Sequence, residues 1–392
     1  MSMRSAASAC QVRQDMAVPR GARTGPRVAP LSYIWWLAFD PGVMMLAISL
    51  TSLRLPAAIR RCPFIPKLCA PKPRHKRRVG KSLHRPLPAS CTLSGMIPYC
   101  TPAPWPQGIP STRMAASIAR GVDPAEATVA LIGLADDEGV RLNHGRIGAR
   151  DGPDAFRHAL SRLGAAEADA PAWPGVFDAG NIGPGTDLQD THDRVTEAVA
   201  AVVELGLLPV AIGGGHDLTF PFVRAVADRF GPMTGVYFDP HLDVRDTPGS
   251  GMSFRRLVET GAATGLFIHG YDPFVNTREA KRWFDAHNGH VEAFGPGDPW
   301  PAGDRFFVSF DLDAVDQAYA PGVSAPNPSG MGPKEAAAWA RAAGKNPRVM
   351  CFDIMELSPQ HDQPPGDGST ARLAAYLFLS FLRGVAERPA GD

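Results

Sequence analysis

The chain is 392 residues long, with 44% hydrophobic and 20% charged residues and a formal net charge of +1. This is enough apolar sequence for one large or two ordinary domains with a real core. It excludes a wholly disordered, collagen-like or disulfide-scaffold protein. The charge is divided unevenly, because residues 1–113 hold about 17 basic side chains and two acids, which leaves the remainder at roughly −14. Only one cysteine, Cys351, lies beyond residue 100, so the later part has no internal disulfide and suits a reducing compartment.

Residues 1–113 are rich in Pro, Arg, Ser and Cys and show no sustained helical or strand period. Their apolar run at 42–53 is too short to span a bilayer and too far from the start for an ordinary signal peptide. Three interpretations remain open: an organellar transit peptide, a basic tail that contacts nucleic acid or membrane, or a non-native, unstructured extension from a start codon set too far upstream. We favour the third, in which Met96 or Met114 would be the true start, and of the two we favour Met114. The sequence therefore predicts a low-order basic extension over 1–113 and a folded domain over 114–392.

From residue 114 onwards, short apolar runs alternate with longer amphipathic stretches. The expected strands are Thr128–Leu134, Leu208–Ile212, Thr234–Phe238, Gly265–His269, Phe306–Phe310 and Arg348–Ile354. The expected helices are Gly152–Leu163, Asp187–Gly206, Thr219–Arg229, Asn276–His287, Pro333–Ala343 and Ser369–Arg383. Continuous apolar runs are typical of strands buried on both faces, and the alternation predicts a parallel sheet covered by helices on both sides. In such a sheet the chemistry lies at the carboxyl ends of the strands.

A glycine run follows the second expected strand. The sequence Ala-Ile-Gly-Gly-Gly-His-Asp occupies 211–217, and its three glycines let the backbone turn tightly and bring His216 close to another group. By itself this motif is weak evidence for a site, because a His after a glycine turn is more often a cap or a surface residue.

The third expected strand ends in a denser cluster of polar side chains. In an extended segment alternate side chains share a face, so Asp239, His241 and Asp243 point to the same side. Two carboxylates and an imidazole at the mouth of a buried strand are costly without a cation. The pattern therefore favours a metal site over a solvated loop.

Another strand end carries Asp311 and Asp313 on one face, and two like charges this close need a positive partner. Alone, this pair fits a Ca²⁺ or Mg²⁺ site or a solvated turn equally well. Together the three strand ends supply two His and four Asp, a set of oxygen and imidazole ligands that suits an ion such as Mn²⁺. Six ligands exceed the need of one catalytic ion and suit a pair of ions roughly 3.5–4 Å apart.

These motifs resemble those of the ureohydrolase family, which includes arginase, agmatinase and formimidoylglutamase. The resemblance covers about residues 129–383; it includes the acidic motif Asp-Ile-Met-Glu-Leu-Ser-Pro at 353–359 and an early segment at 137–149. It implies a three-layer α/β/α sandwich with a central, mostly parallel sheet, and a binuclear centre with two Mn²⁺ per subunit. The implied metal ligands are His216, Asp239, His241, Asp243, Asp311 and Asp313.

The same resemblance implies a hydrolytic mechanism. The two ions would bridge a water and lower its pKa, so that hydroxide forms at neutral pH and attacks an amidine-type carbon. Glu356 matches the family carboxylate that holds the cationic nitrogen group. Asp243 would also pass a proton to the departing amine.

Two departures from the arginase pattern point to one branch of the family. Arginase-like sequences carry Asn where this chain has Arg245, and a proton-shuttling His where it has Phe254. Both features resemble formimidoylglutamase, which hydrolyses N-formimidoyl-L-glutamate to L-glutamate and formamide in histidine degradation. Arg245 is the first candidate partner for the carboxylates of that substrate, and Arg255 is a weaker one. The alternative is a guanidino-compound hydrolase of the agmatinase, guanidinobutyrase or arginase type, which releases urea.

The sequence allows either a structural or a substrate-facing role for two further polar residues, Asn276 and Arg146. We favour the structural role for both. The resemblance also implies a homo-oligomer, either a trimer or a hexamer. We expect a small amidine or guanidino compound as the ligand and the cytoplasm as the compartment. A nucleic acid is not expected as a partner because the part after residue 113 is acidic, and a membrane is not expected because no run can span it.

Overall fold

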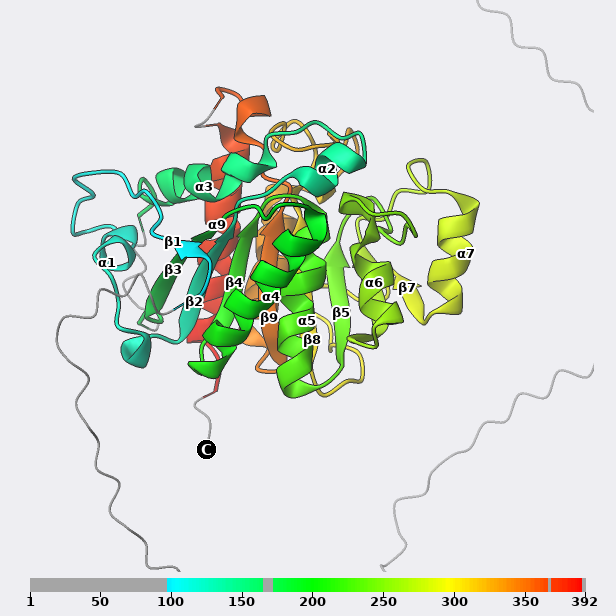
Figure 1. The fold of residues 1–392 in the computed structure, drawn as a ribbon, viewed down its shortest axis with the longest axis horizontal. Helices are drawn as coiled ribbons and strands as arrows, with labels where there is room; N and C mark the ends of the chain where they lie inside the picture. Colours follow the sequence, from blue (N-terminus) through cyan, green and yellow to red (C-terminus); the bar gives the residue numbers. More distant parts are fainter. Residues whose placement is uncertain (1–96, 165–171, 366–367, 390–392) are drawn as a thin grey trace, which may run out of the picture. The chain divides into compact units, whose positions relative to one another are not determined.

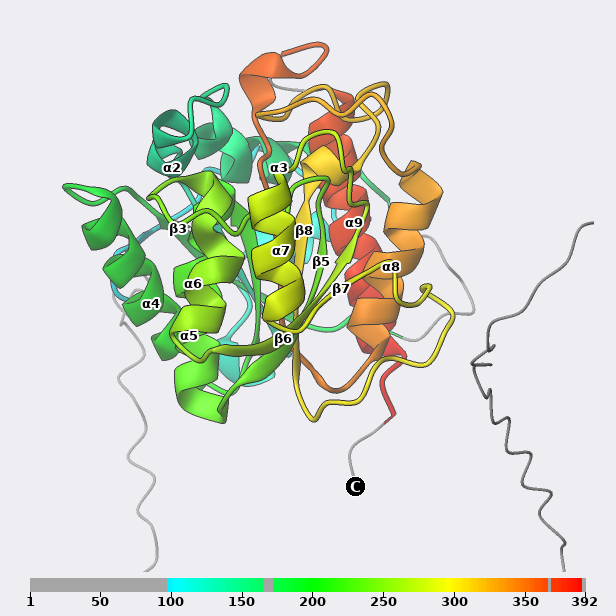
Figure 2. The same ribbon diagram turned by 90° about the vertical axis from the view of Figure 1, so that its right-hand side faces the viewer.

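A computed structural model describes residues 97–164, 172–365 and 368–389. They form a sheet of nine strands in the order β1-β3-β2-β4-β9-β8-β5-β6-β7, in which β1 and β3 are antiparallel and the other pairs are parallel. Helices cover both faces of the sheet (Figure 1, Figure 2). The expected α/β/α sandwich with a mostly parallel sheet is therefore confirmed.

All six strands expected from the sequence are present, to within two residues at each end. The strands are β1 (Cys100–Thr101), β2 (Val129–Leu134), β3 (Val176–Ile182), β4 (Leu208–Gly213), β5 (Met233–Phe238), β6 (Ala263–His269), β7 (Gly289–Val291), β8 (Phe306–Asp311) and β9 (Val349–Met355). Every residue of β2, β5 and β8 is buried. Burial on both faces is the reason that these strands read as uninterrupted apolar runs.

Three strands were not predicted, and β3 is the longest of them. Its sequence, Val-Phe-Asp-Ala-Gly-Asn-Ile, is interrupted by polar residues and glycine, so it does not read as an apolar run. Gly180 has φ +93° and lies where the pairing with β2 shifts register. A Cβ at this glycine would lie 2.1 Å from the carbonyl oxygen of Thr101. The bulge therefore requires glycine, and this tertiary requirement explains a residue that is otherwise unfavourable in a strand.

The helices form two layers. Those on one face are α1 (Ala115–Ala119), α3 (Gly152–Leu160), α8 (Pro333–Lys345) and α9 (Ser369–Ala386). Those on the other face are α4 (Leu188–Glu204), α5 (Thr219–Phe230), α6 (Ser253–Glu259) and α7 (Arg278–Ala286). Side chains alternate between the two cores along each strand: in β5, Val236 and Phe238 join the first and Tyr237 joins the second. The six predicted helices are present, whereas α1, α6 and α2 (Glu138–Leu142) were not predicted.

Residues 97–113 pack against the sheet, although the sequence analysis assigned them to the extension. Ile97 is buried, β1 pairs with β3, and the indole of Trp105 donates a hydrogen bond of 2.8 Å to Oδ2 of Asp178. The packed part of the chain therefore begins before Met114. The rest of the expected extension, with its apolar run at 42–53, lies outside the described residues.

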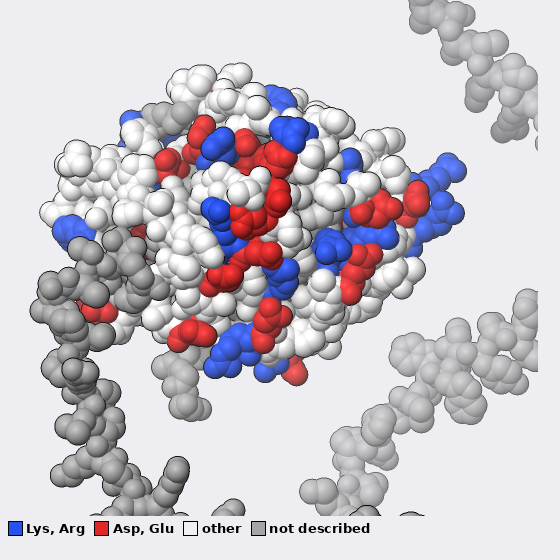
Figure 3. Space-filling model, in the orientation of Figure 1, with Lys and Arg blue, Asp and Glu red and all other residues white. Residues whose placement is uncertain are grey.

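The surface carries mixed charge. Acidic and basic side chains interleave over the face shown in Figure 3. Several of them form ion pairs one helical turn apart, among them Arg194–Asp190, Arg255–Glu259 and Lys281–Asp285. Among the helices that the structure describes, none combines the length and the apolar character needed to cross a membrane.

A buried ion pair joins α3 to the polar strand β3. Arg157 is fully buried and donates hydrogen bonds of 2.7 and 2.9 Å to the carboxylate of Asp178. We expect Asp178→Ala to lower the free energy of unfolding by about 3–5 kcal/mol, because it leaves a buried guanidinium without its anion. Urea denaturation measures this change. Asp193→Ala, which breaks an exposed pair with Arg224, is the control and should cost about 0–1 kcal/mol; equal costs for the two variants would contradict the prediction.

Candidate metal centre

A tight glycine turn carries His216 away from the end of β4. A Cβ on Gly214 would lie 2.3 Å from the carbonyl oxygen of Asp136, and one on Gly213 would lie 2.1 Å from the sulfur of Met355. No side chain fits in either position without a shift of its surroundings. The turn places the imidazole of His216 at the carboxyl edge of the sheet, where it is 1% exposed.

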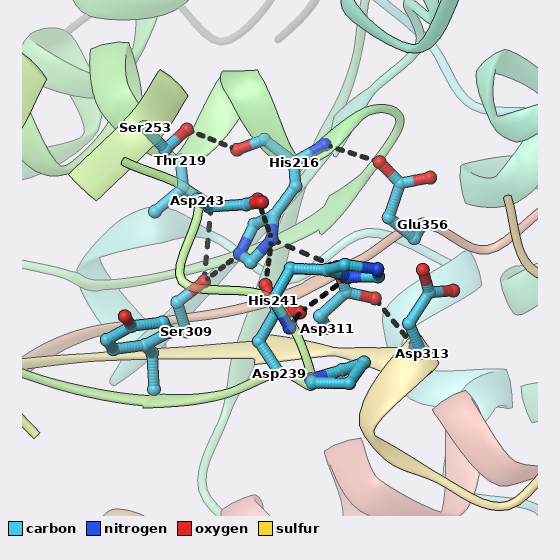
Figure 4. Close-up of polar contacts among 12 residues, drawn as sticks. His216, Thr219, Asp239, His241, Asp243, Ser253, Ser309, Asp311, Asp313 and Glu356 are labelled. Carbon is cyan, nitrogen blue, oxygen red and sulfur yellow. Dashed lines mark hydrogen bonds and ion pairs between the residues drawn. The ribbon is translucent and has the colours of Figure 1, made fainter. Parts of the chain in front are cut away.

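Three carboxylates surround this imidazole (Figure 4). Nδ1 of His216 lies 3.1 Å from Oδ2 of Asp239, 3.1 Å from Oδ2 of Asp243 and 3.0 Å from Oδ2 of Asp311. One potential ligand atom from each of the four residues lies within 4.8 Å of all the others. The aspartates follow β5 and end β8, so the parallel sheet brings together residues that are distant in the sequence.

The electrostatics of this cluster fit a bound cation. Burial and the neighbouring Asp239 raise the pKa of Asp311 to about 6, because ionised carboxylates in a dry site repel one another. Burial disfavours protonation of His216, but Asp311 and the other two carboxylates hold the pKa of this imidazole well above its ordinary value. Nδ1 of His216 and Oδ2 of Asp239 are buried without a hydrogen bond. Unpaired ligand atoms that face one another in an acidic site suit a divalent ion.

The other two expected ligands lie beside the cluster. Nδ1 of His241 is 3.1 Å from Oδ1 of Asp239, and the backbone N–H of Asp313 donates to Oδ1 of Asp311 at 2.7 Å. Asp313 is buried, whereas the side chain of His241 is 28% exposed. All six predicted ligands thus lie at one edge of the sheet, four in a single cluster and two next to it. Their assignment to particular ions stays a prediction.

A buried network behind His216 sets the tautomer of its ring. Nε2 of His216 lies 3.0 Å from Oγ of Ser309, whose hydroxyl donates to Oδ1 of Asp353 at 2.6 Å. Thr219 donates to the other oxygen of Asp353 at 3.1 Å. Since Ser309 gives its one proton to Asp353, Nε2 is the ring nitrogen that donates to Ser309, which leaves Nδ1 as the nitrogen that would bind a metal ion. Sequence reasoning missed these three residues, although Asp353 is the first residue of the acidic motif at 353–359.

Glu356 places a buried carboxylate at the same edge, at the end of β9. Its backbone has φ +65°, and its Oε1 accepts a hydrogen bond of 2.9 Å from the backbone N–H of His216. Its Oε2 is buried and has no hydrogen-bond partner. Burial and the nearby Asp311 raise the pKa of Glu356 to about 8. A cationic group that reached Oε2 would satisfy this oxygen and favour its ionised form.

A cavity of about 390 Å³ opens onto these groups, and its lining includes His241, Asp243, Asp311, Asp313 and Glu356. The cavity thus has an acidic side formed by residues that follow the sheet strands. Asp243 is the most accessible member of the four-residue cluster, with 12% of its side chain exposed. Its backbone has φ +48°, an unfavourable value for a residue other than glycine.

The two arginines proposed as substrate-binding residues lie in different places. Arg245 lines the cavity, and its guanidinium donates to Oδ1 of Asn143. Arg255 lies on α6, where it donates to Glu259 at 2.7 Å and stacks over Trp283 at 5.2 Å, and it is not among the residues that line the cavity. The structure therefore brings Arg245 to the site but not Arg255, because the direction of α6 aims Arg255 at its helical neighbour.

Phe254 and Arg146 both have structural roles, Phe254 through packing and Arg146 through hydrogen bonds to the backbone. Phe254 is fully buried; its ring stacks on Tyr237 with a centroid separation of 3.7 Å and meets the imidazole of His216 edge-on at 5.3 Å. Arg146 lines the cavity, but its guanidinium donates to the backbone carbonyls of Pro321 and Val323. Arg146 thereby holds the segment after β8 in place, in line with the structural role that was favoured for it.

The comparisons with known proteins agree with this geometry. A family model described as the arginase family matches residues 127–383. The chain is 31% identical over 284 residues to formimidoylglutamase from Geobacillus thermodenitrificans, an alignment that covers 66% of this chain and 85% of that protein. It is 32% identical over 284 residues to the mitochondrial guanidino acid hydrolase of Homo sapiens, covering 66% and 78% of the two chains.

A solved structure shows the same fold at similar identity. The crystal structure of Trypanosoma cruzi formiminoglutamase with Mn²⁺ superimposes with a TM-score of 0.63 at 29% identity and covers 70% of this chain and 99% of that one. The residues that the family model matches, 127–383, contain strands β2 to β9 and all six predicted ligands.

Metal addition and removal test the centre without any substrate. We expect Mn²⁺ in excess to raise the midpoint of thermal unfolding by about 5 °C or more and EDTA to reverse the rise, since binding at 100 times the Kd stabilises by about 2.7 kcal/mol. In Asp311→Ala the difference between the Mn²⁺ and EDTA midpoints should nearly disappear. Asp285→Ala removes an exposed carboxylate on α7 and should keep the full difference. A centre that does not bind metal would leave all three proteins unaffected by Mn²⁺.

Proposed function

Because the chain belongs to the arginase family, we propose that it hydrolyses N-formimidoyl-L-glutamate to L-glutamate and formamide with two Mn²⁺ per subunit. One observation carries the proposal: a single cavity is lined by Asp243, Asp311 and Asp313, by Glu356, and by Arg245. Oε2 of Glu356 is buried and has no hydrogen-bond partner among the described residues. The substrate carries both kinds of charge, a cationic formimidoyl group on its α-nitrogen and two carboxylates, one on the adjacent carbon and one at the end of the side chain. Similarity to formimidoylglutamases supports the choice of substrate, and the solved relative with Mn²⁺ supports the choice of metal.

Mn²⁺ held by these side chains would supply hydroxide at neutral pH, because a bound divalent ion lowers the pKa of water. The side chains of the protein would bind and orient the substrate around that nucleophile. Oε2 of Glu356 would pair with the cationic nitrogen group, which fixes the amidine carbon in the cavity. Arg245 would bind a carboxylate through two parallel hydrogen bonds, a geometry that its planar guanidinium favours.

Asp243 is the residue that we assign to proton transfer. It is part of the metal cluster and also reaches the cavity, so its carboxylate can approach both the nucleophile and the leaving group. As the C–N bond breaks, Asp243 would hand a proton to the departing nitrogen of glutamate. General acid–base transfer of this kind contributes about 10²–10⁴-fold to a rate.

A guanidino acid is the second candidate substrate. Such a compound also combines a cationic end with a carboxylate, and the human relative named above is a guanidino acid hydrolase. The product separates the two candidates, because a guanidino substrate releases urea and formimidoylglutamate releases formamide. The homo-oligomer, trimer or hexamer, and the cytoplasmic location stay predictions.

The reaction is best tested with the full chain loaded with Mn²⁺. We expect formamide and glutamate from formimidoylglutamate, and little or no urea from arginine, agmatine or guanidinobutyrate. Asp243→Ala should abolish turnover. Arg245→Ala should lower kcat/KM by about 10- to 100-fold, since a hydrogen bond to a charged group contributes about 1.5–3 kcal/mol.

Arg255→Ala is the matched control, because this arginine lies outside the cavity, and it should keep kcat/KM within about twofold of the native value. Urea from a guanidino substrate, without formamide from formimidoylglutamate, would keep the metal mechanism and contradict the proposed substrate.

A further inference from the structure

Asn276 lies in the loop between β6 and α7 and lines the cavity. Its side chain makes three hydrogen bonds, all of them to backbone groups. Nδ2 donates to the carbonyl oxygen of Pro240 at 2.7 Å and to that of Asp272 at 2.8 Å, and Oδ1 accepts from the backbone N–H of Leu242 at 2.8 Å. Two of these bonds reach the residues immediately before and after His241.

These bonds leave Asn276 without a free donor. A carboxamide has two N–H donors, and both are used on the carbonyl oxygens of Pro240 and Asp272. A substrate carboxylate needs donors, so Asn276 has none to offer it in this arrangement. Its place in the cavity wall therefore indicates a role in holding the protein rather than in binding the substrate.

The backbone conformation of the segment from Asp239 to Asp243 depends on contacts with other parts of the chain. It follows the end of β5; the N–H of Asp239 still donates to the carbonyl oxygen of His269 in β6, but the next residue, Pro240, has no N–H to donate. Asp243 has φ +48°, which costs roughly 1–2 kcal/mol for a residue with a Cβ, and such a conformation persists only where the surroundings over-determine it.

Several contacts supply this restraint from different directions. The buried hydroxyl of Tyr237 donates to the carbonyl oxygen of Leu242 at 3.0 Å, and the backbone N–H of Asp272 donates to that of Pro240 at 3.0 Å. Asn276 adds the bonds on both sides of His241. The imidazole of His241 is 28% exposed and so is not immobilised by packing alone, which makes the position of its backbone decisive for where the ring lies.

We propose that Asn276 is a positioning residue that holds His241 against Asp239 and thereby sets the affinity of the second Mn²⁺ position. The proposal rests on the binuclear centre of the proposed function, but not on the identity of the substrate. His216 is held independently, by Ser309 on one side and by its own backbone bond to Glu356 on the other. Asp239 and Asp243 also keep backbone bonds of their own, to His269 and to Phe254, so loss of Asn276 weakens the ion beside His241 more than the ion beside His216.

The test counts and titrates metal in the full chain. Wild-type protein should bind two Mn²⁺ per subunit, measured by calorimetric titration of the apoprotein and by elemental analysis after dialysis. In Asn276→Ala one site should keep its Kd within about threefold, while the Kd of the site that His241→Ala also weakens rises by about 10- to 100-fold. Catalysis should show a fall in kcat with little change in KM, because the substrate contacts are intact.

Two further variants identify the cause. His241→Ala should weaken the same ion as Asn276→Ala, and the double variant should be no worse than His241→Ala alone, since both substitutions remove one interaction. Asn346→Ala is the matched control: this asparagine also binds the backbone, accepting from the N–H of Arg348, but it lies before β9 at the opposite edge of the sheet. It should bind both ions as the wild type does.

The proposal is wrong if Asn276→Ala binds both ions with wild-type affinity or binds both equally weakly. It is also wrong if the effects of the two substitutions add in the double variant, or if the wild-type protein binds only one ion. Circular dichroism of each apoprotein identifies a variant that has unfolded, and for Asn276→Ala that outcome would mean a general structural role and would also overturn the proposal. If the wild type leaves formimidoylglutamate unchanged while the metal results hold, the proposed substrate fails and the role of Asn276 stands.

Discussion

The geometry of the site depends on one constraint: several buried carboxylates lie close together at the carboxyl edge of the sheet. Three carboxylate oxygens lie 3.0–3.1 Å from a single imidazole nitrogen, and Asp313 and Glu356 add two more buried carboxylates to the same region. Such an arrangement is costly unless a cation neutralises it. The surrounding architecture keeps these groups together: the glycine turn before His216, the left-handed backbone of Asp243, and the network of Ser309 and Asp353 behind the ring.

The parallel topology makes this convergence possible. The sheet order places β4, β9, β8 and β5 next to one another at its centre, and the groups of the site follow or end these four strands. Because the strands are parallel, their carboxyl ends meet at one edge. Helix layers cover both faces of the sheet (Figure 2), and every residue of β5 and β8 is buried, so the site follows strands that are packed on both sides.

Around the acidic cluster, amide side chains hold the cationic and metal-binding groups in place. Asn143 accepts a hydrogen bond from Arg245, and Asn276 binds the backbone on both sides of His241. Phe254 fills the space beside His216 with a ring stacked on Tyr237. These residues build a cavity with carboxylates in one part and a guanidinium in another, a distribution of charge that suits a small substrate with both a cationic and an anionic end.

Three kinds of feature could be predicted from the amino-acid sequence alone: the strands that are buried on both faces, the six helices with clear amphipathic periods, and the six candidate ligands. All of these are local patterns of residue type and spacing, which is why they can be read without coordinates. Glu356 and Arg245 were found through the resemblance to a known family, and both line the cavity. The prediction of a low-order basic extension cannot be compared with the structure over residues 1–96, because these lie outside the described part of the chain.

Features that depend on partners distant in the sequence could be assigned only from the three-dimensional structure. β3 escaped prediction because its Asp178 and Asn181 are polar, and their place in a sheet makes sense only beside the buried Arg157. The sequence left Arg255 as a candidate for substrate binding, but in the structure it forms an ion pair with Glu259 on the same helix, α6. Asn276 was ambiguous for the same reason: an amide can bind substrate or backbone with the same atoms, and only the fold brings the carbonyl oxygen of Pro240 and the N–H of Leu242 within its reach.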